Sequence, residues 1–590
     1  MRHGLTNALI AIAAGAGVAA AQQASPDPRN DWEVRPGFSL SVDTDGYRFP
    51  TAIAFVPQPG PGPKDPLYFV TELRGRVKVV TNDRTVHTFV EGLTAATSRF
   101  ELPDDFGEHG VAGICLDPSR GYVFVTFAYD DDAGERRNNV VRFQTTPGTF
   151  SLEPAGRVDF TEIFAAFPSS HSHQIGPCHV RGDHLYVSVG DGHLSVQSQY
   201  PQSVLGKVLR MTVDGQPVRS NPMYSDGDRR NPENLVWAMG LRNPFGLEMI
   251  GDRVFVADNG INADRFIELE SGGNYGWDGG DRSLTVNALV VFAPAASPVT
   301  LEYYPAGSTL FPAEYREKFY LILAGKLMSD GPGQFQERSI VTLDLDLVAD
   351  RMRGPPELFV RYRGDGAQSP VGMAFGPDGL YFASILPAAS GSSAIYRVSH
   401  DPANEHAHVI GRSNDPSTLI ADRQCRGCHQ LAGRGGEAGP ALDQPDLTTR
   451  LQQRLGSTDY AAQVAAIDSV PLEPYTDYAG ARREVMAADG SERVRAWLRY
   501  RLLEPRFDSR ESAMPNPGLT HAQADALADY LMDAQPTANA RRPTASRSLI
   551  GRVRQAIPPS RHRFTLLAFM IGAVIGGIAS ARVLRRKHGA

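Results

Sequence analysis

The chain has 590 residues, more than one hydrophobic core usually supports, so two or more domains are expected. Its composition is that of an ordinary globular protein, with 42% hydrophobic and 21% charged residues. The formal net charge is −7 and no long basic run precedes the C-terminal tail, which argues against nucleic acid as a partner.

The chain begins with the three regions of a secretory signal peptide, which we assign to residues 1 to 21. Met1-Arg2-His3 carries positive charge, residues 8 to 18 are small or aliphatic, and Ala19-Ala20-Ala21 forms a small-residue cleavage site. A short buried helix is the alternative, but it does not explain the order of the three regions. The sequence therefore predicts export from the cytoplasm.

Residues 33 to 400 repeat one pattern, in which a short aromatic and β-branched strand is followed by a polar turn or loop and a second strand. The first strands are predicted at residues 67–70, 122–125, 185–188, 254–257, 319–322 and 380–383. The second strands are predicted at residues 77–80, 140–143, 207–210, 266–269, 340–343 and 394–397. Six such units favour an all-β, six-bladed β-propeller over a β-sandwich, because radial repetition leaves only short protected edges. Ligands are then expected on loops at the mouth of the central channel.

The sequence pattern changes after residue 400, where the repeated strand units end. Residues 401 to 416 are polar and turn-rich, as in a linker, and a small all-α domain is predicted from 412 to 536. Thr520 and Gln523 could form a capping box at the start of its last helix. Residues 537 to 560 are rich in Arg, Pro, Ser and Ala, which is typical of a flexible tether.

Residues 564 to 581 contain no charged side chain and are just long enough to cross a bilayer, so they predict a transmembrane helix. Four basic residues follow within six positions: Arg582, Arg585, Arg586 and Lys587. Such an excess marks the cytoplasmic side of a membrane. Together with the signal peptide, it predicts a protein anchored on the periplasmic side of the bacterial inner membrane.

The pentapeptide Cys425-Arg426-Gly427-Cys428-His429 has the attachment signature of c-type haem. Cys425 and Cys428 would bind the porphyrin covalently, and His429 would be the proximal iron ligand. A zinc half-site or a thiol redox pair is the alternative, but no second ligand pair lies nearby. The other two cysteines, Cys115 and Cys178, are far upstream; they could form a disulfide outside the cytoplasm or remain two buried thiols.

The predicted all-α domain resembles class I cytochrome c over nearly all its length. Gly439-Pro440 stands at the family's spacing, which implies a hydrogen bond from His429 to the Pro440 carbonyl. Met514-Pro515 matches the distal ligand before the last helix, with Met486 and Met532 as competing candidates. A thioether ligand raises the haem potential, which suits an electron acceptor.

Residues 33 to 400 resemble the glucose/sorbosone dehydrogenase family, six-bladed propellers that use pyrroloquinoline quinone. The resemblance rests on motifs in a fixed order: His173-Gln174-Ile175-Gly176, Val189-Gly190-Asp191, Gly206-Lys207-Val208-Leu209-Arg210, Asp214-Gly215, Asn221-Pro222, Gly240-Leu241-Arg242-Asn243-Pro244, Asp258-Asn259-Gly260-Ile261-Asn262 and Gly272-Gly273-Asn274-Tyr275-Gly276-Trp277. It implies that His173 is the general base that takes a proton from a sugar hydroxyl, although His171 and His179 leave the register open.

The same resemblance implies further site residues. Arg242 and Asn243 would contact cofactor oxygens, with Arg242 stabilising developing charge, and Lys326 would be a further cofactor contact. A catalytic calcium would be held by the backbone carbonyls of Gly260 and Ile261.

The chain also departs from the family pattern. Glu108 stands where soluble glucose dehydrogenases have glutamine, which brings a negative charge toward the site, and Arg265-Phe266 replaces the acidic pair of a second calcium. Arg361 and Arg363 match the family's late arginines, whereas Ser369-Pro370 lacks the arginine that many relatives have there.

These features predict a periplasmic quinoprotein dehydrogenase that oxidises a sugar or a related alcohol or aldehyde. Electrons would pass to the chain's own haem and then to a downstream redox protein or the respiratory chain. A calcium-dependent lactonase or other hydrolase is one alternative. A non-catalytic binding propeller that delivers the haem domain to a partner is another.

Overall fold

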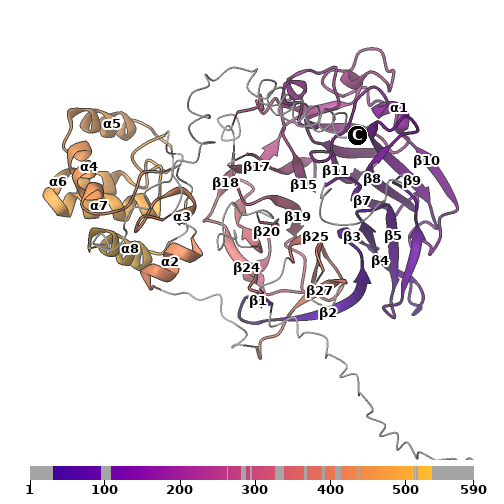
Figure 1. Cartoon of the computed structure of the whole chain (residues 1–590), viewed down its shortest axis with the longest axis horizontal. Coiled ribbons are helices and arrows are strands. Elements are labelled where there is room, and N and C mark those ends of the chain that lie inside the picture. The colour runs from indigo at the N-terminus through magenta and orange to yellow at the C-terminus, as the bar shows by residue number, and fades with distance from the viewer. Residues whose placement is uncertain are drawn as a thin grey trace, which may run out of the picture. The chain divides into compact units, whose positions relative to one another are not determined.

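The computed structural model describes residues 31–94, 108–261, 263–280, 288–292, 295–325, 338–364, 368–387, 392–404, 414–423, 425–434, 439–472, 474–510, 512, 514, 516–517 and 519–533. Strands predominate from Trp32 to His400, a part that also holds the short helix α1 (Thr161–Phe164), and helices make up the part from Pro416 to Asp533 (Figure 1).

Within the described residues, six antiparallel sheets form the blades, each ordered here from its innermost strand outward. Blade 1 holds β3 (Pro50–Phe55), β4 (Pro66–Glu72), β5 (Arg76–Thr81) and β6 (Val86–Val90). Blade 2 holds β7 (Val111–Asp117), β8 (Tyr122–Asp130), β9 (Arg136–Gln144) and β10 (Gly156–Asp159). Blade 3 holds β11 (Ile175–Arg181), β12 (His184–Val189), β13 (Lys207–Thr212) and β14 (Val236–Met239).

The other three blades complete the set. Blade 4 holds β15 (Pro244–Ile250), β16 (Arg253–Asp258), β17 (Asp264–Leu269) and β18 (Val290–Phe292). Blade 5 holds β19 (Pro298–Tyr304), β20 (Lys318–Leu323), β21 (Ser339–Leu343), β24 (Glu357–Tyr362) and β1 (Trp32–Val34). Blade 6 holds β25 (Pro370–Phe375), β26 (Leu380–Ser384), β27 (Ser393–His400) and β2 (Phe38–Tyr47). A two-stranded ribbon of β22 (Leu345–Asp346) and β23 (Arg351–Met352) lies outside them.

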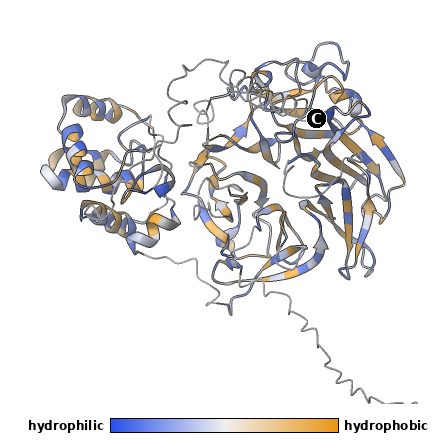
Figure 2. Ribbon diagram, in the orientation of Figure 1, coloured by the Kyte–Doolittle hydropathy of each residue, from blue (hydrophilic) through white to orange (hydrophobic). Residues whose placement is uncertain are grey.

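The innermost strands form a closed ring. β3 contacts β7, β7 contacts β11, β11 contacts β15, β15 contacts β19, β19 contacts β25, and β25 contacts β3 again. Figure 1 shows these six strands around the middle of the β-rich part. Hydrophobic residues recur along the strands in the ribbon of Figure 2. Buried hydrophobic side chains of neighbouring blades pack together, as blade 2 does with blade 3 and with blade 1. The predicted six-bladed propeller is therefore confirmed.

The chain closes this ring with its own first strands. β2 runs antiparallel to β27 from Phe38 opposite His400 to Tyr47 opposite Ser393, so the last blade is completed by the beginning of the chain. Asp43 of β2 accepts hydrogen bonds from Tyr68 and Arg84 of blade 1, each at 2.8 Å. Blade 6 is thereby joined to blade 1 through both backbone and side chains.

The sequence predicted the second and third strands of every blade but missed the innermost ones. Innermost strands carry Gly or Pro, which weaken a strand signal, and each has a register irregularity near its start. Close approach of blades explains the glycines: a Cβ on Gly113 would lie 2.8 Å from the Cα of Pro177, and one on Gly372 would lie 2.9 Å from the Thr51 carbonyl oxygen.

One end of the propeller collects the loops that precede the innermost strands, and we call it the mouth face. β11 begins opposite the end of β12, and β15 begins opposite the end of β16, so loops from both positions meet there. Bonds between blades confirm the arrangement: the Asp191 amide donates to the Arg242 carbonyl at 2.7 Å, and Asn259 Nδ2 donates to the Pro298 carbonyl at 2.6 Å.

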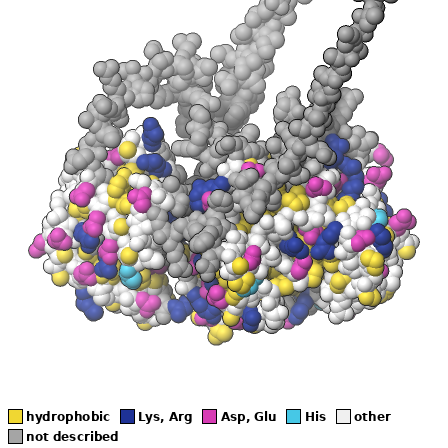
Figure 3. Space-filling view, turned by 90° about the horizontal axis from the view of Figure 1, so that it is seen from below, with side chains coloured by type: hydrophobic (Ala, Val, Ile, Leu, Met, Phe, Trp, Pro, Cys, Tyr) yellow, Lys and Arg dark blue, Asp and Glu magenta, His cyan; other side chains and the backbone are white. Residues whose placement is uncertain are grey.

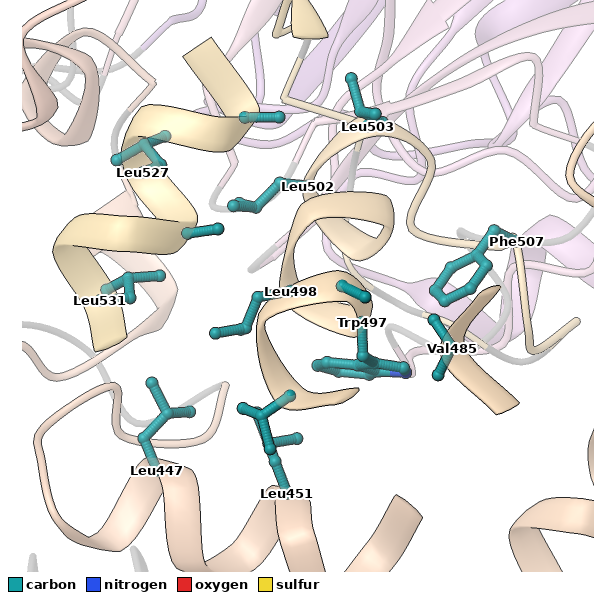
Figure 4. Close-up of a cluster of buried hydrophobic side chains, with 14 of the residues drawn as sticks. Leu447, Leu451, Val485, Trp497, Leu498, Leu502, Leu503, Phe507, Leu527 and Leu531 are labelled. Atoms are coloured by element: carbon teal, nitrogen blue, oxygen red, sulfur yellow. The ribbon is translucent and has the colours of Figure 1, made fainter. Parts of the chain in front are cut away.

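The helical part consists of α2 (Pro416–Asp422), α3 (Cys425–Cys428), α4 (Asp446–Leu455), α5 (Thr458–Asp468), α6 (Ala479–Ala487), α7 (Gly490–Leu503) and α8 (His521–Asp533). Figure 4 shows Trp497 and Leu498 of α7 among leucines of α4 and α8. The predicted capping box is present, because the Thr520 amide donates to Gln523 Oε1 and the Gln523 amide donates to Thr520 Oγ1.

Two predicted segments, residues 1 to 21 and 564 to 581, lie outside the described residues. In the part of the chain that the structure describes, no helix combines the length and the apolar character that crossing a membrane requires. On the face shown in Figure 3, acidic and basic side chains are interspersed and form no single-sign patch.

Candidate active site

His173 lies on the mouth face, in the loop that leads into β11. The residue is buried and its backbone is left-handed, with φ of 54°, a conformation that is costly for a residue with a Cβ. Its carbonyl accepts a hydrogen bond from the Gly192 amide at 3.0 Å, so the loop after β12 crosses directly over it. Such strain is typical of functional sites.

Asp191 orients the His173 ring. His173 Nδ1 and Asp191 Oδ1 are 2.6 Å apart, and Asp191 Oδ2 accepts from Trp277 Nε1 at 2.8 Å. Burial raises the pKa of Asp191, but hydrogen bonds from His173, Trp277 and the His193 amide outweigh burial and bring that pKa below its usual value. A charged carboxylate can only accept, so Nδ1 carries a proton in this pair, and in the neutral form of the ring the lone pair lies on Nε2.

Gly190 explains why the two loops can approach so closely. A Cβ on Gly190 would lie 2.4 Å from the His173 carbonyl oxygen and 2.6 Å from its carbonyl carbon. These are backbone atoms and cannot move aside as a flexible side chain would. Only glycine therefore fits between the strand end that carries Asp191 and the loop that carries His173.

Gly190→Ala is accordingly expected to displace His173 and to lower the free energy of unfolding by about 1–3 kcal/mol. Thermal unfolding and a comparison of turnover with the wild type check this result. Gly156→Ala on β10 is the control, because its Cβ would meet only the Gln144 Cβ at an ordinary 3.7 Å. Equal stability of the two variants would contradict the expectation.

Glu108 is held at the edge of the same site. Its Oε2 accepts from the His173 amide at 3.3 Å, and its carbonyl accepts from Gln174 Nε2 at 2.7 Å. Gln174 Oε1 in turn accepts from the Gly110 amide at 3.0 Å. The Glu108 carboxylate, which the sequence analysis expected near the site, therefore accepts a hydrogen bond from the backbone of His173.

Arg242 and Asn243 precede β15 and are positioned by one buried carboxylate. Asp258 Oδ1 accepts from the Arg242 amide at 3.1 Å and from the Asn243 amide at 2.8 Å. The Arg242 guanidinium donates to the Asn259 carbonyl at 2.9 Å and lies over the Trp277 ring, 5.7 Å from its centroid. Trp277 thus contacts both Arg242 and Asp191, the partner of His173.

Arg265 forms a fully buried ion pair with Asp258, with Nη2 and Oδ2 2.9 Å apart. The guanidinium also donates to the carbonyls of Gly240 and Tyr275. It therefore joins the turn that presents Arg242 to the loop that presents Trp277. Arg265, which stands where the resemblance would place an acidic residue of a second calcium site, therefore has a structural role in this chain.

Gly260 and Ile261, the predicted calcium carbonyls, lie just after β16. The Gly260 amide donates to Asp264 Oδ1 at 2.7 Å, and Asp264 Oδ2 accepts from the amides of Ala296 and Ser297. Burial raises the pKa of Asp264 to about 6, although these three amides favour its charged form. The loop is thereby fixed by its amides, and its carbonyls remain the groups suited to a cation. No cluster of three or more His, Cys, Asp or Glu side chains with metal-binding geometry occurs in the described residues.

The remaining predicted cofactor contacts lie in or beside blade 5. Arg361, at the mouth-face end of β24, is buried and donates to Glu33 of β1 at 2.7 Å, and Arg363 donates to the same carboxylate at 3.1 Å. Lys326 lies outside the described residues. Ser369 is fully buried and its hydroxyl donates to the Ala324 carbonyl at 2.7 Å.

Cys115 of β7 and Cys178 of β11 form a disulfide with a Cα–Cα distance of 5.7 Å. The sequence left this pairing open. The bond joins the innermost strands of blades 2 and 3, which follow the Glu108 loop and the His173 loop. It therefore connects the two blades that carry these residues.

In the helical part, His429 makes the hydrogen bond that its resemblance to cytochromes implied. Its Nδ1 lies 2.7 Å from the Pro440 carbonyl oxygen, which accepts and so leaves Nε2 for a ligand. Gly439 provides the space, because a Cβ there would lie 2.5 Å from Cε1 of the ring. Cys425 and Cys428 are the first and last residues of α3. Met514 packs against the helical core, and so do Met486 and Met532.

The propeller part of the chain is similar to known proteins. Residues 48–284 match the sequence model of the Glucose / Sorbosone dehydrogenase family. The matched range contains His173, Asp191, Arg242 and Gly260. It ends before Lys326 and before the helical part.

Several curated proteins are similar to this chain. An uncharacterized protein of Synechocystis is 25% identical over 359 residues, which are 53% of this chain and 80% of that protein. Quinoprotein glucose dehydrogenase B of Acinetobacter calcoaceticus is 26% identical over 212 residues, 30% of this chain and 42% of that enzyme. Aldose sugar dehydrogenase YliI of Escherichia coli is 26% identical over 198 residues, 32% of this chain and 51% of that enzyme. The chain thus spans about half or less of the two named dehydrogenases.

Among solved structures, the PQQ-bound form of aldose sugar dehydrogenase from Streptomyces coelicolor has a TM-score of 0.44 and 22% identity, and the match covers 62% of this chain and 100% of that one. The soluble aldose sugar dehydrogenase from Escherichia coli in the apo-form has a TM-score of 0.45 and 17% identity, with 62% and 99% covered.

Sequence reasoning missed three residues of the site: Asp191, Asp258 and Trp277. Asp191 and Asp258 stood in quoted motifs without a role, although a polar residue at the end of a buried strand signals a loop function. Trp277 gave no such signal, because its contact with Asp191 joins residues 86 positions apart.

Proposed function

We propose that this protein is a quinoprotein dehydrogenase of the Glucose / Sorbosone dehydrogenase family that oxidises a sugar or a related alcohol or aldehyde. The observation that carries the proposal is the buried His173–Asp191 pair beside Arg242 and Asn243 on the mouth face. The family match over residues 48–284 and the named quinoprotein and aldose sugar dehydrogenases among the relatives support it.

The roles of the chain's own residues follow from their geometry. His173 Nε2 accepts the proton of the substrate hydroxyl, and Asp191 stabilises the imidazolium that results. Arg242 and Asn243 bind oxygens that gain negative charge, with further contacts from Lys326, Arg361 and Arg363. When bound, pyrroloquinoline quinone supplies the acceptor for the hydride that leaves the substrate carbon. The negative charge of Glu108 repels anionic substrates, so the site favours neutral ones.

A calcium ion is proposed at the backbone carbonyls of Gly260 and Ile261. Calcium binds oxygen ligands in flexible geometry, so two carbonyls in a fixed loop suit it. The bonds from Asp264 to the Gly260, Ala296 and Ser297 amides hold that loop in place. This carboxylate would keep the carbonyls fixed when the cation is exchanged.

We also propose that the helical part binds a covalent c-type haem through Cys425 and Cys428, with His429 and Met514 as axial ligands. The His429–Pro440 bond supports the proposal, because it fixes the ring and leaves Nε2 unprotonated for iron. Fusion keeps the haem at high effective concentration near the propeller. Electrons would leave to a downstream redox protein or the respiratory chain.

Gly439→Ala tests this haem site. Its methyl group would occupy the space of the His429 ring, so we expect the ring to move and the Pro440 bond to break. The variant should bind haem covalently but with a shifted reduction potential, measured by redox titration of haem absorbance. Gly433→Ala, which faces open space at positive φ, is the control for backbone effects alone. An unchanged potential in Gly439→Ala would contradict the proposal.

The proposed location is the periplasmic side of the inner membrane, with residues 1 to 21 as signal peptide and residues 564 to 581 as anchor. The Cys115–Cys178 disulfide supports an oxidising compartment. Cell fractionation of a tagged chain tests this location. Recovery in the cytoplasm would contradict it.

One experiment separates the proposed function from its alternatives. The apo-protein is given Ca²⁺ and pyrroloquinoline quinone, and haem reduction is followed across a panel of aldoses, alcohols and lactones. We expect reduction that requires quinone, Ca²⁺ and sugar together. Lactone hydrolysis without haem reduction would indicate a hydrolase. If no quinone binds and no lactone is hydrolysed, the remaining alternative is a non-catalytic propeller that binds a partner.

A further inference from the structure

Three histidines on the mouth face are stacked on one another. The rings of His173 and His193 have centroids 3.9 Å apart and planes at 26°, and the rings of His171 and His193 are 4.8 Å apart at 13°. His173 is buried, whereas the other two residues are exposed. The stack therefore runs from solvent to the proposed base, with His193 in the middle.

Two hydrogen bonds hold His193 in this position. Its amide donates to Asp191 Oδ1 at 2.9 Å, which is the oxygen that also binds His173 Nδ1. Its Nε2 lies 2.5 Å from Ser172 Oγ. One carboxylate oxygen thus aligns both histidines, one through its ring and the other through its backbone.

The stack is formed at a cost to the backbone. His173 has φ of 54° and His193 has φ of 62°, so both residues adopt the left-handed conformation that favours glycine. Both loops therefore carry strain at the residues whose rings lie face to face, which is a reason to look for a function of the ring contact.

The charges around His193 keep its ring neutral. His171 and His173 flank it from the loop before β11, Arg242 approaches from the loop before β15, and Asp191 lies at the end of β12. Partial burial of the ring and the neighbouring His173, His171 and Arg242 together lower the pKa of His193 to about 4, and the Asp191 carboxylate only partly opposes this shift. A neutral imidazole face attracts a cation, so it favours the imidazolium form of the ring beneath it.

We propose that His193 is a positioning residue of His173, whose neutral ring holds the base in plane and stabilises the positive charge that the base acquires. This inference rests on the proposed function only for the identity of the reaction. Neither the stack nor its effect on the His173 ring requires the cofactor.

The test uses the full chain with ¹³C-labelled histidine and follows the His173 ring signal, assigned with His173→Asn, during a pH titration without cofactor. His193→Phe keeps a neutral aromatic face, and we expect it to leave the pKa of His173 close to that of the wild type. His193→Gly removes the ring and admits water to the Asp191 pair, so we expect the His173 pKa to fall by about half a unit or more.

His193→Gly also separates positioning from support of the fold. Glycine relieves the left-handed strain, so the melting temperature should stay equal or rise while kcat falls about tenfold with little change in KM. His184→Phe, at the opposite end of β12, is the control and should leave the His173 titration unchanged.

The outcomes are distinct. An unchanged His173 pKa in His193→Gly, or the same pKa shift in His193→Phe and His193→Gly, would overturn the proposal whatever the activity. A shift in His193→Gly alone, in a protein that oxidises no sugar with quinone and Ca²⁺, would uphold the positioning role and reject the proposed function.

Discussion

His173→Asn is expected to lower quinone-dependent sugar oxidation about 10²- to 10⁴-fold, the usual contribution of a positioned general base. Asparagine is chosen because it tolerates the left-handed backbone that His173 adopts, so the loop should keep its conformation. The loss should be in kcat more than in KM, because the ring acts when the hydroxyl proton leaves. Stopped-flow measurement of haem reduction gives both quantities.

The controls are the two histidines that the sequence could not separate from His173. His171 is exposed and His179 lies within β11, 3.4 Å from Glu248 in the neighbouring blade and away from Asp191. His171→Asn and His179→Asn should therefore keep most of the activity. Retention of full activity in His173→Asn, or a comparable loss in His179→Asn, would show that the base is assigned to the wrong residue.

Removal of the Cys115–Cys178 disulfide is expected to lower the free energy of unfolding of the propeller by about 4 kcal/mol. The two cysteines are 63 residues apart, and closing a loop of that length in the unfolded chain gives this figure in the chain-entropy model. The double variant Cys115→Ala/Cys178→Ala avoids a mispaired thiol. Urea unfolding monitored by tryptophan fluorescence measures the change.

Reductant provides the matched comparison. Wild-type protein unfolded in the presence of dithiothreitol should approach the stability of the double variant, whereas the double variant should not respond to the reductant. A difference of less than about 1 kcal/mol between oxidised wild type and the double variant would contradict the expectation, because native-state relaxation would then offset the entropy term.

The strands found from the sequence are those whose neighbours on both sides are strands of the same blade. β4, β8 and β16 are continuous apolar runs for this reason, and their signal is local. The innermost strands meet other blades, where Gly113 and Gly372 allow backbones to touch, so their residues are set by distant contacts. β2 was missed because its partner β27 lies about 350 residues later in the chain.

The residues of the candidate site fall into the same two groups, those that stand in local motifs and those whose contacts join distant segments. His173, Arg242 and Asn243 were named because they stand in local motifs that resemble a known family. The His429–Pro440 bond, which spans eleven residues, was expected from the resemblance to class I cytochrome c. The supports of these residues were not found. Trp277 meets Asp191, and Arg265 joins Gly240 to Tyr275, only when loops of different blades come together.

The candidate residues of the mouth face came from the resemblance to a known family. By itself, the sequence determined six repeated strand units and a helical part with its capping box. Each of these depends on periodicity or spacing within a short stretch of chain, where backbone geometry alone relates the residues. The tertiary structure decided the closure by β2, the Cys115–Cys178 pairing, and the stacking of His193 on His173. These features depend on contacts between segments far apart in the chain, which only the packing of complete blades brings together. A local sequence pattern carries no information about which distant segments will meet.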